Sequence, residues 1–551
     1  MMDIKAMVEA QLLDPKYDEE YKAQLKALSE EEARECFYKE LSFGTAGIRG
    51  KLGVGPNRMH KYLVRSVSYA YALYLKEQQE EPSAVIAYDS RNGSPEFAQE
   101  AARTLASNDV KTYLFDQYAS TPELSFAVRY LDATGGIVIT ASHNPPEYNG
   151  YKVYHRSGRQ LLQEEAGDIL RLVEENKEKT DIPFRTAEEL IEEGRLEMIG
   201  DNILGAYDGV ILAAVKNPAC RDMASQLRIV YTPLHGVGWR AMHSFAQNFG
   251  LTKLYPVESQ MHPDGSFPEA RQPNPENPEV FEKAIAIAEE KGADLILATD
   301  PDVDRIGAMV RGDDGFEMID GNQMGALMAE YLFSLRQGQG GTVITSVVST
   351  SLVDAIASTY KGRVLRTLTG FKYIGEAMDT LCDNEFVLGF EESYGYLSGL
   401  HARDKDAINA AALIIEMALS ALSQGKSLLD KQREIEEKYG YYKEGQIVLT
   451  LEGEEGAQKI RSLMAGFRDS PLEKVATGRR TELTDYLEDT DLPKEDVIKW
   501  NFRGDQWVAI RPSGTEPKLK IYLGSHGQSA NDVRNNYRDL ENSMKALLEK
   551  E

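Results

Sequence analysis

The sequence is poor in positive charge, in cysteine and in long apolar runs. Its 551 residues include 62 Lys and Arg against 88 Asp and Glu, a formal net charge of −26, so its surface repels nucleic acid and anionic lipid. Three widely spaced cysteines, Cys36, Cys220 and Cys382, indicate neither a disulfide framework nor a zinc site. No stretch of eighteen apolar residues and no apolar leader segment occurs. We therefore expect a cytoplasmic protein that binds neither nucleic acid nor membranes.

The composition is that of a folded protein with several domains. Hydrophobic residues make up 42% and charged residues 27% of the chain, which excludes the disordered and fibrous classes. At roughly 150 residues per domain, this length corresponds to three or four domains. Because the overall charge is negative, an anionic substrate would need Arg and Lys side chains gathered at its binding site.

Apolar segments of strand length alternate with helical patterns over most of the chain. Strands are predicted at 83–90, 135–142, 227–233, 293–300, 341–348 and 385–393, and each ends in polar, acidic or glycine-containing residues. The first forty residues and segments such as 94–107 and 277–292 have helical periodicity. The alternation predicts α/β domains whose ligands bind at the carboxyl ends of the strands.

The last hundred residues have a different pattern. Strand-like segments at 446–453, 505–512 and 518–525 precede a closing helix at 531–550, which predicts a smaller α+β domain. We place domain boundaries near residues 207, 323 and 440. The four predicted domains then cover residues 1–207, 208–323, 324–440 and 441–551.

The segment TASHNPPEYNGYK, residues 140–152, directly follows a predicted strand. Ser142 lies there among His143, Asn144 and two prolines, in a loop stiff enough to keep a hydroxyl in one place. A serine hydroxyl is a weak nucleophile unless a base or a charged group activates it. Ser142 is thus a candidate nucleophile, although a turn with a capping serine explains this segment equally well by itself.

The segment ADLILATDPDVDRIG, residues 293–307, carries three alternating acids. An extended stretch could direct Asp300, Asp302 and Asp304 at one cation, and such hard oxygen ligands suit Mg²⁺ or Ca²⁺ but not zinc. An EF-hand loop is excluded, because Arg305 and Arg311 stand at its sixth and twelfth positions.

Two other interpretations of this acidic segment remain open. Phosphatases of the haloacid-dehalogenase type follow a strand with Asp-x-Asp-x-Thr/Val and become phosphorylated on the first Asp, which would be Asp300. Here the fifth position is Asp304, which favours a third metal ligand. The other alternative is a solvated acidic turn, but three acids behind a buried strand are unfavourable without a cation.

The segment VAIRPSGTEPKLKIYL, residues 508–523, is predicted to form two strands joined by a loop. Arg511 can bind a phosphate bidentately, Ser513 and Thr515 supply hydroxyls, Gly514 allows close approach of the backbone, and Lys518 adds charge. A polar hairpin turn is the alternative, but a turn does not need so many phosphate donors at once.

Other segments give weaker signals. Glu391 and Ser393, in the GFEES segment at a strand end, can hydrogen-bond to neighbouring sugar hydroxyls. Residues 369–372, TGFK, and residues 403–406, RDKD, are candidate substrate loops.

Four single residues are further candidates. Arg49 and Arg91 could balance a phosphate, although an isolated Arg is usually a surface ion-pair partner. Lys152 could act as a general acid or base if desolvation lowered its pKa. His235 is better interpreted as structural.

Taken together and in this order, the segments resemble the α-D-phosphohexomutase superfamily from about residue 41 to residue 524. TASHNP resembles its phosphoserine loop, DPDVDR its metal loop, GFEES its sugar-binding loop and RPSGTEPK its phosphate-binding loop. The resemblance implies three similar α/β domains with mixed sheets and a smaller α+β domain at the C-terminus, arranged around a central cleft.

The candidate site residues fall into three groups. The catalytic candidates are Ser142, Lys152, Arg49 and His143. The expected ligands of one Mg²⁺ are Asp300, Asp302, Asp304 and an oxygen of phosphorylated Ser142. The expected substrate contacts come from Arg305, Gly370, Phe371, Lys372, Glu391, Ser393, Lys405, Arg511, Ser513, Gly514, Thr515 and Lys518.

The reaction implied by the resemblance is the reversible interconversion of glucose 1-phosphate and glucose 6-phosphate. The phosphoserine would donate its phosphoryl group to the sugar, and the resulting glucose 1,6-bisphosphate, also the expected activator, would return its other phosphate to Ser142. Glucose is placed first because TGFK resembles the T-G-W-K loop of glucose-specific members. Moreover, Tyr394 and Gly395 depart from the GEMSGH pattern of phosphomannomutase/phosphoglucomutase members.

Several alternatives remain. Within the family, these are phosphomannomutase and phosphopentomutase activity. From different classes, they are a sugar phosphatase with Asp300 as nucleophile and a catalytically silent sugar-phosphate sensor. No macromolecular partner is expected, and the sequence does not predict the oligomeric state.

Overall fold

The structure is a computed structural model that describes residues 3–41, 47–177, 179–451, 453–470, 472–475, 478–488, 490–513 and 518–549. The chain forms two compact units. The first comprises Met1–Met318 and Tyr394–Leu419, and the second comprises Ile319–Ser393 and Ser420–Glu551.

Three short helices begin the first unit: α1 (Ile4–Leu13), α2 (Glu19–Ala27) and α3 (Glu30–Phe37). The side chains of Asp3, Asp18 and Ser29 accept hydrogen bonds from backbone amides at the helix starts, which lack partners within the helix. The three helices pack around buried Phe37 and against Tyr62 of α4 (Lys61–Gln78). The helical pattern of the first forty residues is confirmed.

The first sheet has six strands in the order β1-β5-β4-β2-β3-β6. The strands are β1 (Ile48–Lys51), β2 (Ser83–Tyr88), β3 (Lys111–Phe115), β4 (Gly135–Ile139), β5 (Tyr148–His155) and β6 (Leu196–Ile199). β4, β2, β3 and β6 are parallel, whereas β5 runs antiparallel to β4 and β1 antiparallel to β5. The return from β4 into β5 places residues 140–147 in a loop at the carboxyl end of β4.

Helices cover this sheet and bury its central strands. In addition to α4, they are α5 (Ser94–Ser107), α6 (Thr121–Tyr130), α7 (Gln163–Glu175) and α8 (Ala187–Glu192). α5 and α6 pack against the parallel strands, while α4 packs beside α5 and α7. β2 and β4 therefore consist almost entirely of buried apolar residues, as expected for strands covered on both faces.

The second sheet has the order β11-β10-β9-β7-β8. Its strands are β7 (Ile229–Thr232), β8 (Leu254–Pro256), β9 (Leu295–Thr299), β10 (Ile306–Gly312) and β11 (Gly315–Ile319). The accompanying helices are α9 (Asp201–Ala213), η1 (Pro218–Gln226), α10 (Trp239–Phe249), α11 (Glu258–Met261), η2 (Pro278–Phe281) and α12 (Glu282–Lys291). β9 is parallel to β7 and antiparallel to β10, so residues 300–305 form the hairpin loop between β9 and β10.

Residues 394–419 return to the first unit after the chain has left it. They form β15 (Gly395–Leu397) and most of α16 (Ala407–Leu422). The backbone amide of Ala407 donates to the carbonyl of Val303 at 3.1 Å, and the Arg403 amide donates to Ser125 Oγ at 2.9 Å. This segment therefore packs beside the loop between β9 and β10.

The second unit begins with three parallel strands in the order β13-β12-β14. These are β12 (Thr342–Ser346), β13 (Arg363–Thr367) and β14 (Phe386–Glu391), and their helices are α13 (Gly321–Leu335), α14 (Leu352–Thr359), α15 (Phe371–Asp379) and α17 (Leu428–Tyr439). α15 follows β13, and its start lies beside the end of β14, where the Gly370 amide donates to a Glu391 carboxylate oxygen.

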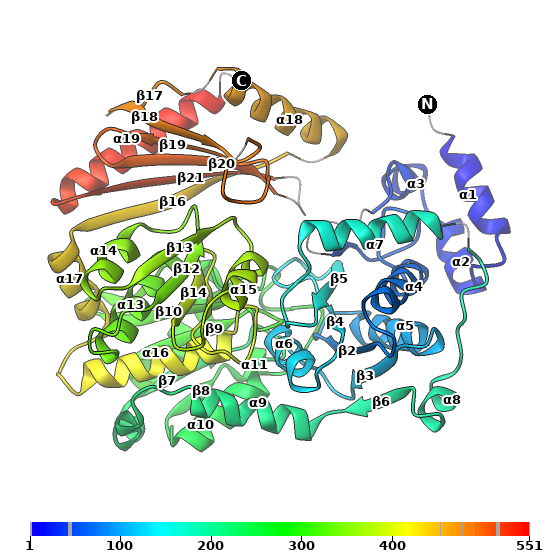
Figure 1. Ribbon diagram of the computed structural model, residues 1–551, viewed down its shortest axis with the longest axis horizontal. Coiled ribbons are helices and arrows are strands. Elements are labelled where there is room, and N and C mark those ends of the chain that lie inside the picture. Colours follow the sequence, from blue (N-terminus) through cyan, green and yellow to red (C-terminus); the bar gives the residue numbers. More distant parts are fainter. Residues whose placement is uncertain are drawn as a thin grey trace. The chain divides into compact units, whose positions relative to one another are not determined.

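The fourth sheet is antiparallel, with the order β16-β21-β20-β19-β18-β17. Its elements are β16 (Tyr441–Thr450), α18 (Gly453–Asp469), β17 (Lys474–Val475), β18 (Gly478–Asp485), β19 (Ile498–Phe502), β20 (Gln506–Pro512), β21 (Lys518–Gly527) and α19 (Ala530–Leu548). Helix α19, red in Figure 1, packs along β16 and β21. β20 and β21 flank the predicted phosphate-binding loop.

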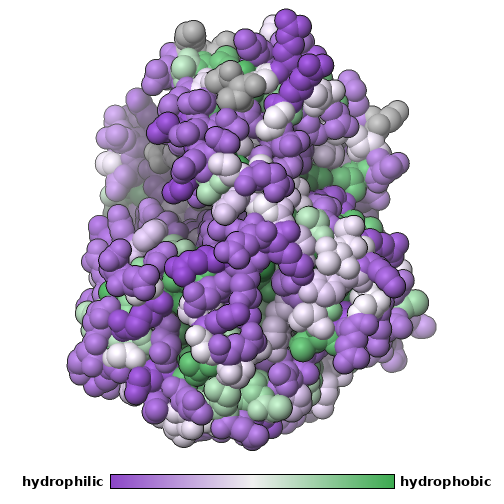
Figure 2. All heavy atoms as spheres, turned by 90° about the vertical axis from the view of Figure 1, so that its left-hand side faces the viewer, coloured by the Kyte–Doolittle hydropathy of each residue, from purple (hydrophilic) through white to green (hydrophobic). Residues whose placement is uncertain are grey.

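The predicted fold class is confirmed, with three α/β sheets followed by a smaller sheet domain at the C-terminus. The domain limits at residues 207, 323 and 440 remain predictions. Hydrophilic residues dominate the face shown in Figure 2. Among the described residues, no helix combines the length and the apolar character needed to cross a bilayer.

Candidate active site

The loop after β4 holds Ser142 in a fixed and unusual conformation. Its backbone φ is +52°, in the left-handed region that residues other than glycine seldom adopt. The Ser142 amide donates to Thr140 Oγ1 at 2.8 Å, and only 3% of the residue is exposed. A side-chain hydrogen bond thus holds the loop in addition to the two prolines from which its stiffness was predicted.

The Ser142 hydroxyl lies between an acid and an imidazole. It donates a hydrogen bond to Asp300 Oδ2 at 2.8 Å, and its oxygen is 3.1 Å from His143 Nδ1. Ser142 and Asp300 are 158 positions apart in the sequence, so the fold of the first unit brings the predicted nucleophile to the predicted metal loop.

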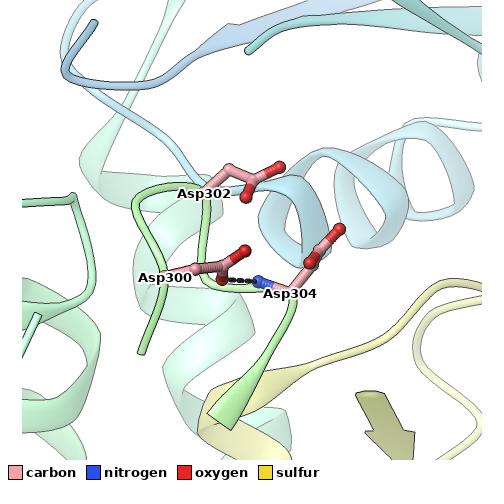
Figure 3. Close-up of side chains that lie close together, drawn as sticks. All are labelled: Asp300, Asp302 and Asp304. Carbon is pink, nitrogen blue, oxygen red and sulfur yellow. Dashed lines mark hydrogen bonds between the residues drawn. The ribbon is translucent and has the colours of Figure 1, made fainter. Parts of the chain in front are cut away.

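The three aspartates of that loop lie close together. One ligand atom from each of Asp300, Asp302 and Asp304 lies within 4.8 Å of the others, and all three residues are buried. Figure 3 shows their carboxylates on the same side of the loop. The expectation of an extended segment was wrong, because residues 300–304 form a tight turn in which Val303 has a φ of +62°.

Backbone hydrogen bonds explain why this turn forms. Asp300 Oδ1 accepts hydrogen bonds from the amides of Asp304 and Arg305, both at 3.0 Å, and the first of these is drawn in Figure 3. The Val303 amide donates to the Asp300 carbonyl at 3.1 Å. Asp300 therefore closes the turn with one carboxylate oxygen and contacts Ser142 with the other.

The donor set fits a hard divalent cation. Oδ1 of Asp302 and Oδ1 of Asp304 are buried and accept no hydrogen bond within the described part of the chain, a costly state for carboxylate oxygens. Burial, followed by the charges of Asp302 and Asp304, raises the pKa of Asp300 well above its usual range. Oxygen ligands of this kind suit Mg²⁺ or Ca²⁺.

Two lysines balance part of this negative charge. Lys152 Nζ is 2.8 Å from Asp302 Oδ2 and 3.4 Å from Asp304 Oδ2. Lys405 Nζ is 3.2 Å from Asp304 Oδ2 and 3.3 Å from Asp404 Oδ1. Burial by itself would raise the pKa of Asp304, but Lys405, Lys152 and Arg305 outweigh burial and lower it.

The structure places Lys152 in this cluster but does not lower its pKa. Burial acts to lower the pKa of the ammonium, yet the charges of Asp302 and Asp304 outweigh burial and raise it. Lys152 is therefore an ammonium in this state and a possible proton donor. The lowered pKa on which the sequence prediction of a general acid or base depended is therefore not present in this state.

Two of the arginine candidates of this unit, Arg305 and Arg49, contact neighbouring side chains. Arg305 forms an ion pair with Glu276, and its Nε is 3.9 Å from Asp304 Oδ1. Arg49, on β1, donates from Nη1 to Asn144 Oδ1 at 2.7 Å, and so lies beside the Ser142 loop. His235 is buried, and burial lowers its pKa, consistent with a structural residue.

Sequence reasoning missed one contact to the metal loop. Thr121, the first residue of α6, donates from Oγ1 to Asp302 Oδ2 at 2.9 Å, and its amide donates to the Asp302 carbonyl at 3.0 Å. The motif Ser120-Thr121-Pro122-Glu123 signals a helix start with a capping box. A capping signal identifies a helix start but not the loop that the helix start contacts.

The second unit brings together the predicted sugar loop and the TGFK segment. Glu391 Oε1 accepts a hydrogen bond from the Gly370 amide at 2.7 Å, and Gly370 has a φ of +120°. Phe371 and Lys372 are buried at the start of α15, whereas Ser393 is partly exposed just after β14. Phe371 and Lys372 stay predicted substrate contacts.

The phosphate-loop arginine joins this group. Arg511, in β20, donates from Nη1 to Thr369 Oγ1 in the TGFK segment. Burial would lower the pKa of Arg511, but Tyr522, Glu392, Glu495 and Glu391 outweigh burial and raise it. Arg511 therefore lies near enough to Glu391 and Glu392 of the sugar-binding loop for their charges to raise its pKa.

The rest of the phosphate loop is described only in part. The Ser513 amide donates to the Lys518 carbonyl at 2.8 Å, which continues the pairing of β20 with β21. Gly514 and Thr515, both predicted substrate contacts, lie outside the described residues.

Family models match most of the chain. The models described as phosphoglucomutase/phosphomannomutase, alpha/beta/alpha domains I, II and III, match residues 40–180, 212–314 and 320–439. They include Ser142, the three aspartates and Glu391, but not the N-terminal helices or the fourth sheet.

Named relatives match over nearly their whole length. A phosphoglucomutase of Staphylococcus epidermidis is 37% identical over 512 residues, covering 90% of this chain and 92% of the relative. A phosphoglucomutase of Staphylococcus aureus is 37% identical over 522 residues, covering 92% of this chain and 93% of the relative.

Solved structures have the same fold. The open form of parafusin, a phosphoglucomutase of Paramecium, superposes with a TM-score of 0.70 at 19% identity, covering 93% of this chain and 95% of that one. A phosphoglucomutase/phosphomannomutase family protein of Burkholderia thailandensis gives a TM-score of 0.66 at 20% identity, covering 92% of this chain and 97% of that one.

Proposed function

The chain belongs to the phosphoglucomutase/phosphomannomutase family, and from this premise we propose that it interconverts glucose 1-phosphate and glucose 6-phosphate through a phosphoserine at Ser142. Relatives named phosphoglucomutase support the choice of glucose. The observation that carries the proposal is the 2.8 Å hydrogen bond from the Ser142 hydroxyl to Asp300, the first of three buried aspartates.

Asp300, Asp302 and Asp304, with one phosphoserine oxygen, would hold a single Mg²⁺. A bound divalent cation neutralises charge on a phosphoryl group during transfer. The Oδ1 oxygens of Asp302 and Asp304, which accept no hydrogen bond from the described residues, support this assignment. Lys152 and Lys405 supply further positive charge beside the Oδ2 oxygens of the same two aspartates, which favours the negatively charged transition state.

In the first transfer, the oxygen of the free sugar hydroxyl bonds to the phosphoserine phosphorus, and the bond from phosphorus to Ser142 Oγ breaks. The sugar hydroxyl loses one proton and Ser142 gains one. Glucose 1,6-bisphosphate then returns its other phosphoryl group to Ser142, and the two protons move back. We assign one of these proton transfers to the Lys152 ammonium. The same bisphosphate would load an unphosphorylated protein, which makes it the expected activator.

The second unit would bind the sugar phosphate. Arg511 presents a guanidinium that can bind phosphate bidentately, and Glu391 and Ser393 stand at the end of β14 for the sugar hydroxyls. Lys372, Ser513, Gly514, Thr515 and Lys518 remain proposed contacts. The cytoplasmic location predicted from the cysteine content also stays a prediction.

A direct test combines mass spectrometry with a coupled assay. Intact-mass measurement is expected to show one phosphate on Ser142, and Ser142→Ala is expected to abolish conversion of glucose 1-phosphate supplied with trace bisphosphate. Ser68→Ala is the matched control, because Ser68 is a buried serine of α4 whose hydroxyl is 2.9 Å from the Tyr151 hydroxyl. Normal turnover by Ser142→Ala would refute the proposal.

The same assay separates the alternatives. Mannose and pentose 1-phosphates, run in parallel, test phosphomannomutase and phosphopentomutase activity, and a higher kcat/KM with either sugar would replace glucose as the assigned substrate. Release of inorganic phosphate without isomerisation would favour the phosphatase with Asp300 as nucleophile. Binding without turnover of any sugar phosphate would favour a silent sensor.

A further inference from the structure

A buried arginine lies against the loop that carries Ser142. Only 1% of Arg91 is exposed, and its guanidinium donates four hydrogen bonds to backbone carbonyls between β4 and the start of β5. Nη1 donates to Pro145 at 2.9 Å and Tyr148 at 3.0 Å. Nη2 donates to Ser142 and Asn144, each at 2.5 Å. One side chain therefore binds the loop at four points along seven residues.

A second side chain, that of Asp89 just after β2, connects Arg91 to the loop. Arg91 Nε is 3.4 Å from Asp89 Oδ2, and the same oxygen accepts a hydrogen bond from Thr140 Oγ1 at 2.6 Å. Thr140 Oγ1 in turn accepts the hydrogen bond from the Ser142 amide. Asp89 thus links the guanidinium, through Thr140 Oγ1, to the backbone amide of Ser142. Its Oδ1 accepts hydrogen bonds from the Arg91 amide and from Ser94 Oγ.

Arg91 is not placed to bind a substrate phosphate. The four hydrogen bonds from its terminal nitrogens all go to carbonyls of the loop. Its Cζ also lies 4.9 Å from the centroid of the Phe267 ring. Burial lowers the pKa of Arg91 to about 10, against the opposing charge of Asp89, so the side chain still carries its charge at neutral pH. A charged and buried guanidinium is costly unless its donors are satisfied. The loop carbonyls accept hydrogen bonds from both terminal nitrogens, and Nε faces the Asp89 carboxylate as an ion pair.

We infer that Arg91 is a positioning residue for phosphoryl transfer, which holds Ser142 Oγ at the metal loop by fixing the backbone around it. The inference rests on the proposed function. Ser142 occupies a left-handed conformation that is unfavourable for residues other than glycine and persists only if its surroundings enforce it. The hydrogen bonds from Arg91 to Ser142 and Asn144 also hold those two carbonyl oxygens against the positively charged guanidinium.

Holding the loop backbone requires the planar guanidinium of arginine, which presents several donors in a fixed geometry. Lysine at position 91 would keep the charge, but a single ammonium with three donors cannot bind the four carbonyls that the two terminal guanidinium nitrogens bind. A contact that supplied charge alone would tolerate Arg91→Lys. A contact that fixes backbone geometry would not, because misplacing a reacting group by about 1 Å can lower the rate about a hundredfold.

The test measures kcat and KM of Arg91→Lys in the full chain with Mg²⁺ and trace bisphosphate. The expected result is a fall in kcat of about a hundredfold with KM for glucose 1-phosphate nearly unchanged, together with a shifted or broadened ³¹P resonance of phosphorylated Ser142. Arg58→Lys is the matched control. Arg58 is also a buried arginine that donates to backbone carbonyls, those of Glu35 and Asn57.

Thr140→Val is a second variant, for use if Arg91→Lys does not fold. It removes the acceptor of the Ser142 amide while leaving the charge of Arg91 in place, and it is expected to lower kcat more than it changes KM. Unchanged kcat in a folded Arg91→Lys or Thr140→Val, a loss confined to KM, or an equal loss in Arg58→Lys would each overturn the inference.

The wild-type protein separates this inference from the proposed function. If the wild type neither carries phosphate on Ser142 nor isomerises glucose 1-phosphate, the proposed function fails whatever the variants do. If the wild type is phosphorylated and active while Arg91→Lys keeps its kcat and its ³¹P resonance, only the role of Arg91 fails.

Discussion

Replacing Lys152 tests how much its ammonium stabilises the buried carboxylates of Asp300, Asp302 and Asp304. Its ammonium lies 2.8 Å from Asp302 Oδ2, and at an effective dielectric constant of 20 this attraction amounts to about 6 kcal/mol before desolvation is subtracted. Removing one partner of a buried pair costs about 3–5 kcal/mol, because the other charge stays buried and uncompensated. We therefore expect Lys152→Met to lower the stability of the metal-free protein by about that amount.

Mg²⁺ should restore much of this loss. A ligand present at a hundred times its dissociation constant stabilises the folded state by about 2.7 kcal/mol, and the gain should be larger in the variant because the cation replaces the missing ammonium. The assay is thermal unfolding in EDTA and in saturating MgCl₂. For a domain of 150–250 residues, each kcal/mol shifts Tm by roughly 2–4 °C, so the difference between wild type and variant should shrink measurably with Mg²⁺.

The matched control for this experiment is Lys283→Met. Lys283 forms an ion pair with Glu269 on the surface, where such pairs contribute no more than about 1 kcal/mol. Equal losses for Lys152→Met and Lys283→Met would refute the argument, as would a loss from Lys152→Met that is the same with and without Mg²⁺.

Three other predictions follow from the same structure. Dialysis against EDTA is expected to stop isomerisation, and MgCl₂ but not NaCl should restore it; activity that survives chelation would contradict the oxygen-ligand site. Burial raises the pKa of Glu444 from 4.5 to about 7, although a hydrogen bond with Thr350 acts to lower it. Its contribution to stability is therefore present below about pH 4.5 and lost as the pH rises through 7, and Glu444→Gln should flatten denaturant stability across this range. Tyr373→Phe removes a 2.7 Å hydrogen bond to Glu495, which should cost about 1 kcal/mol in unfolding experiments; unchanged stability would show that water replaces the bond.

The strands and helices with the strongest periodicity were predictable from the sequence. The buried strands β2, β4, β7, β9, β12 and β14 all lie within predicted segments, and α12 ends at Gly292 in a left-handed conformation, as its glycine suggested. The antiparallel partners β5 and β10 were missed, although they create the two active-site loops. β5 mixes polar and apolar residues without strict alternation, and β10 contains a short apolar run between two glycines, so the identity of each strand depends on the strand beside it.

The candidate site was predictable as a set of residues but not as a geometry. Local patterns identified Ser142 and the three aspartates, yet the hydrogen bond between Ser142 and Asp300 joins two different sheets. The raised pKa of Lys152 also needs the structure, since it depends on Asp302, 150 positions away. Likewise, Arg91 looked like a possible phosphate ligand because nothing in its own segment shows that four carbonyls occupy it.

The return of residues 394–419 to the first unit has a consequence for how the protein is made. Lys405 contributes to the acidic cluster, and Asp404 accepts a hydrogen bond from the Tyr154 hydroxyl at 2.8 Å. A ribosome adding about 5–20 residues per second therefore exposes the first two sheets well before the segment that completes them. Nascent chains halted before residue 394 should lack this closing segment and be cut by protease within the first unit, whereas chains released after residue 419 should resist.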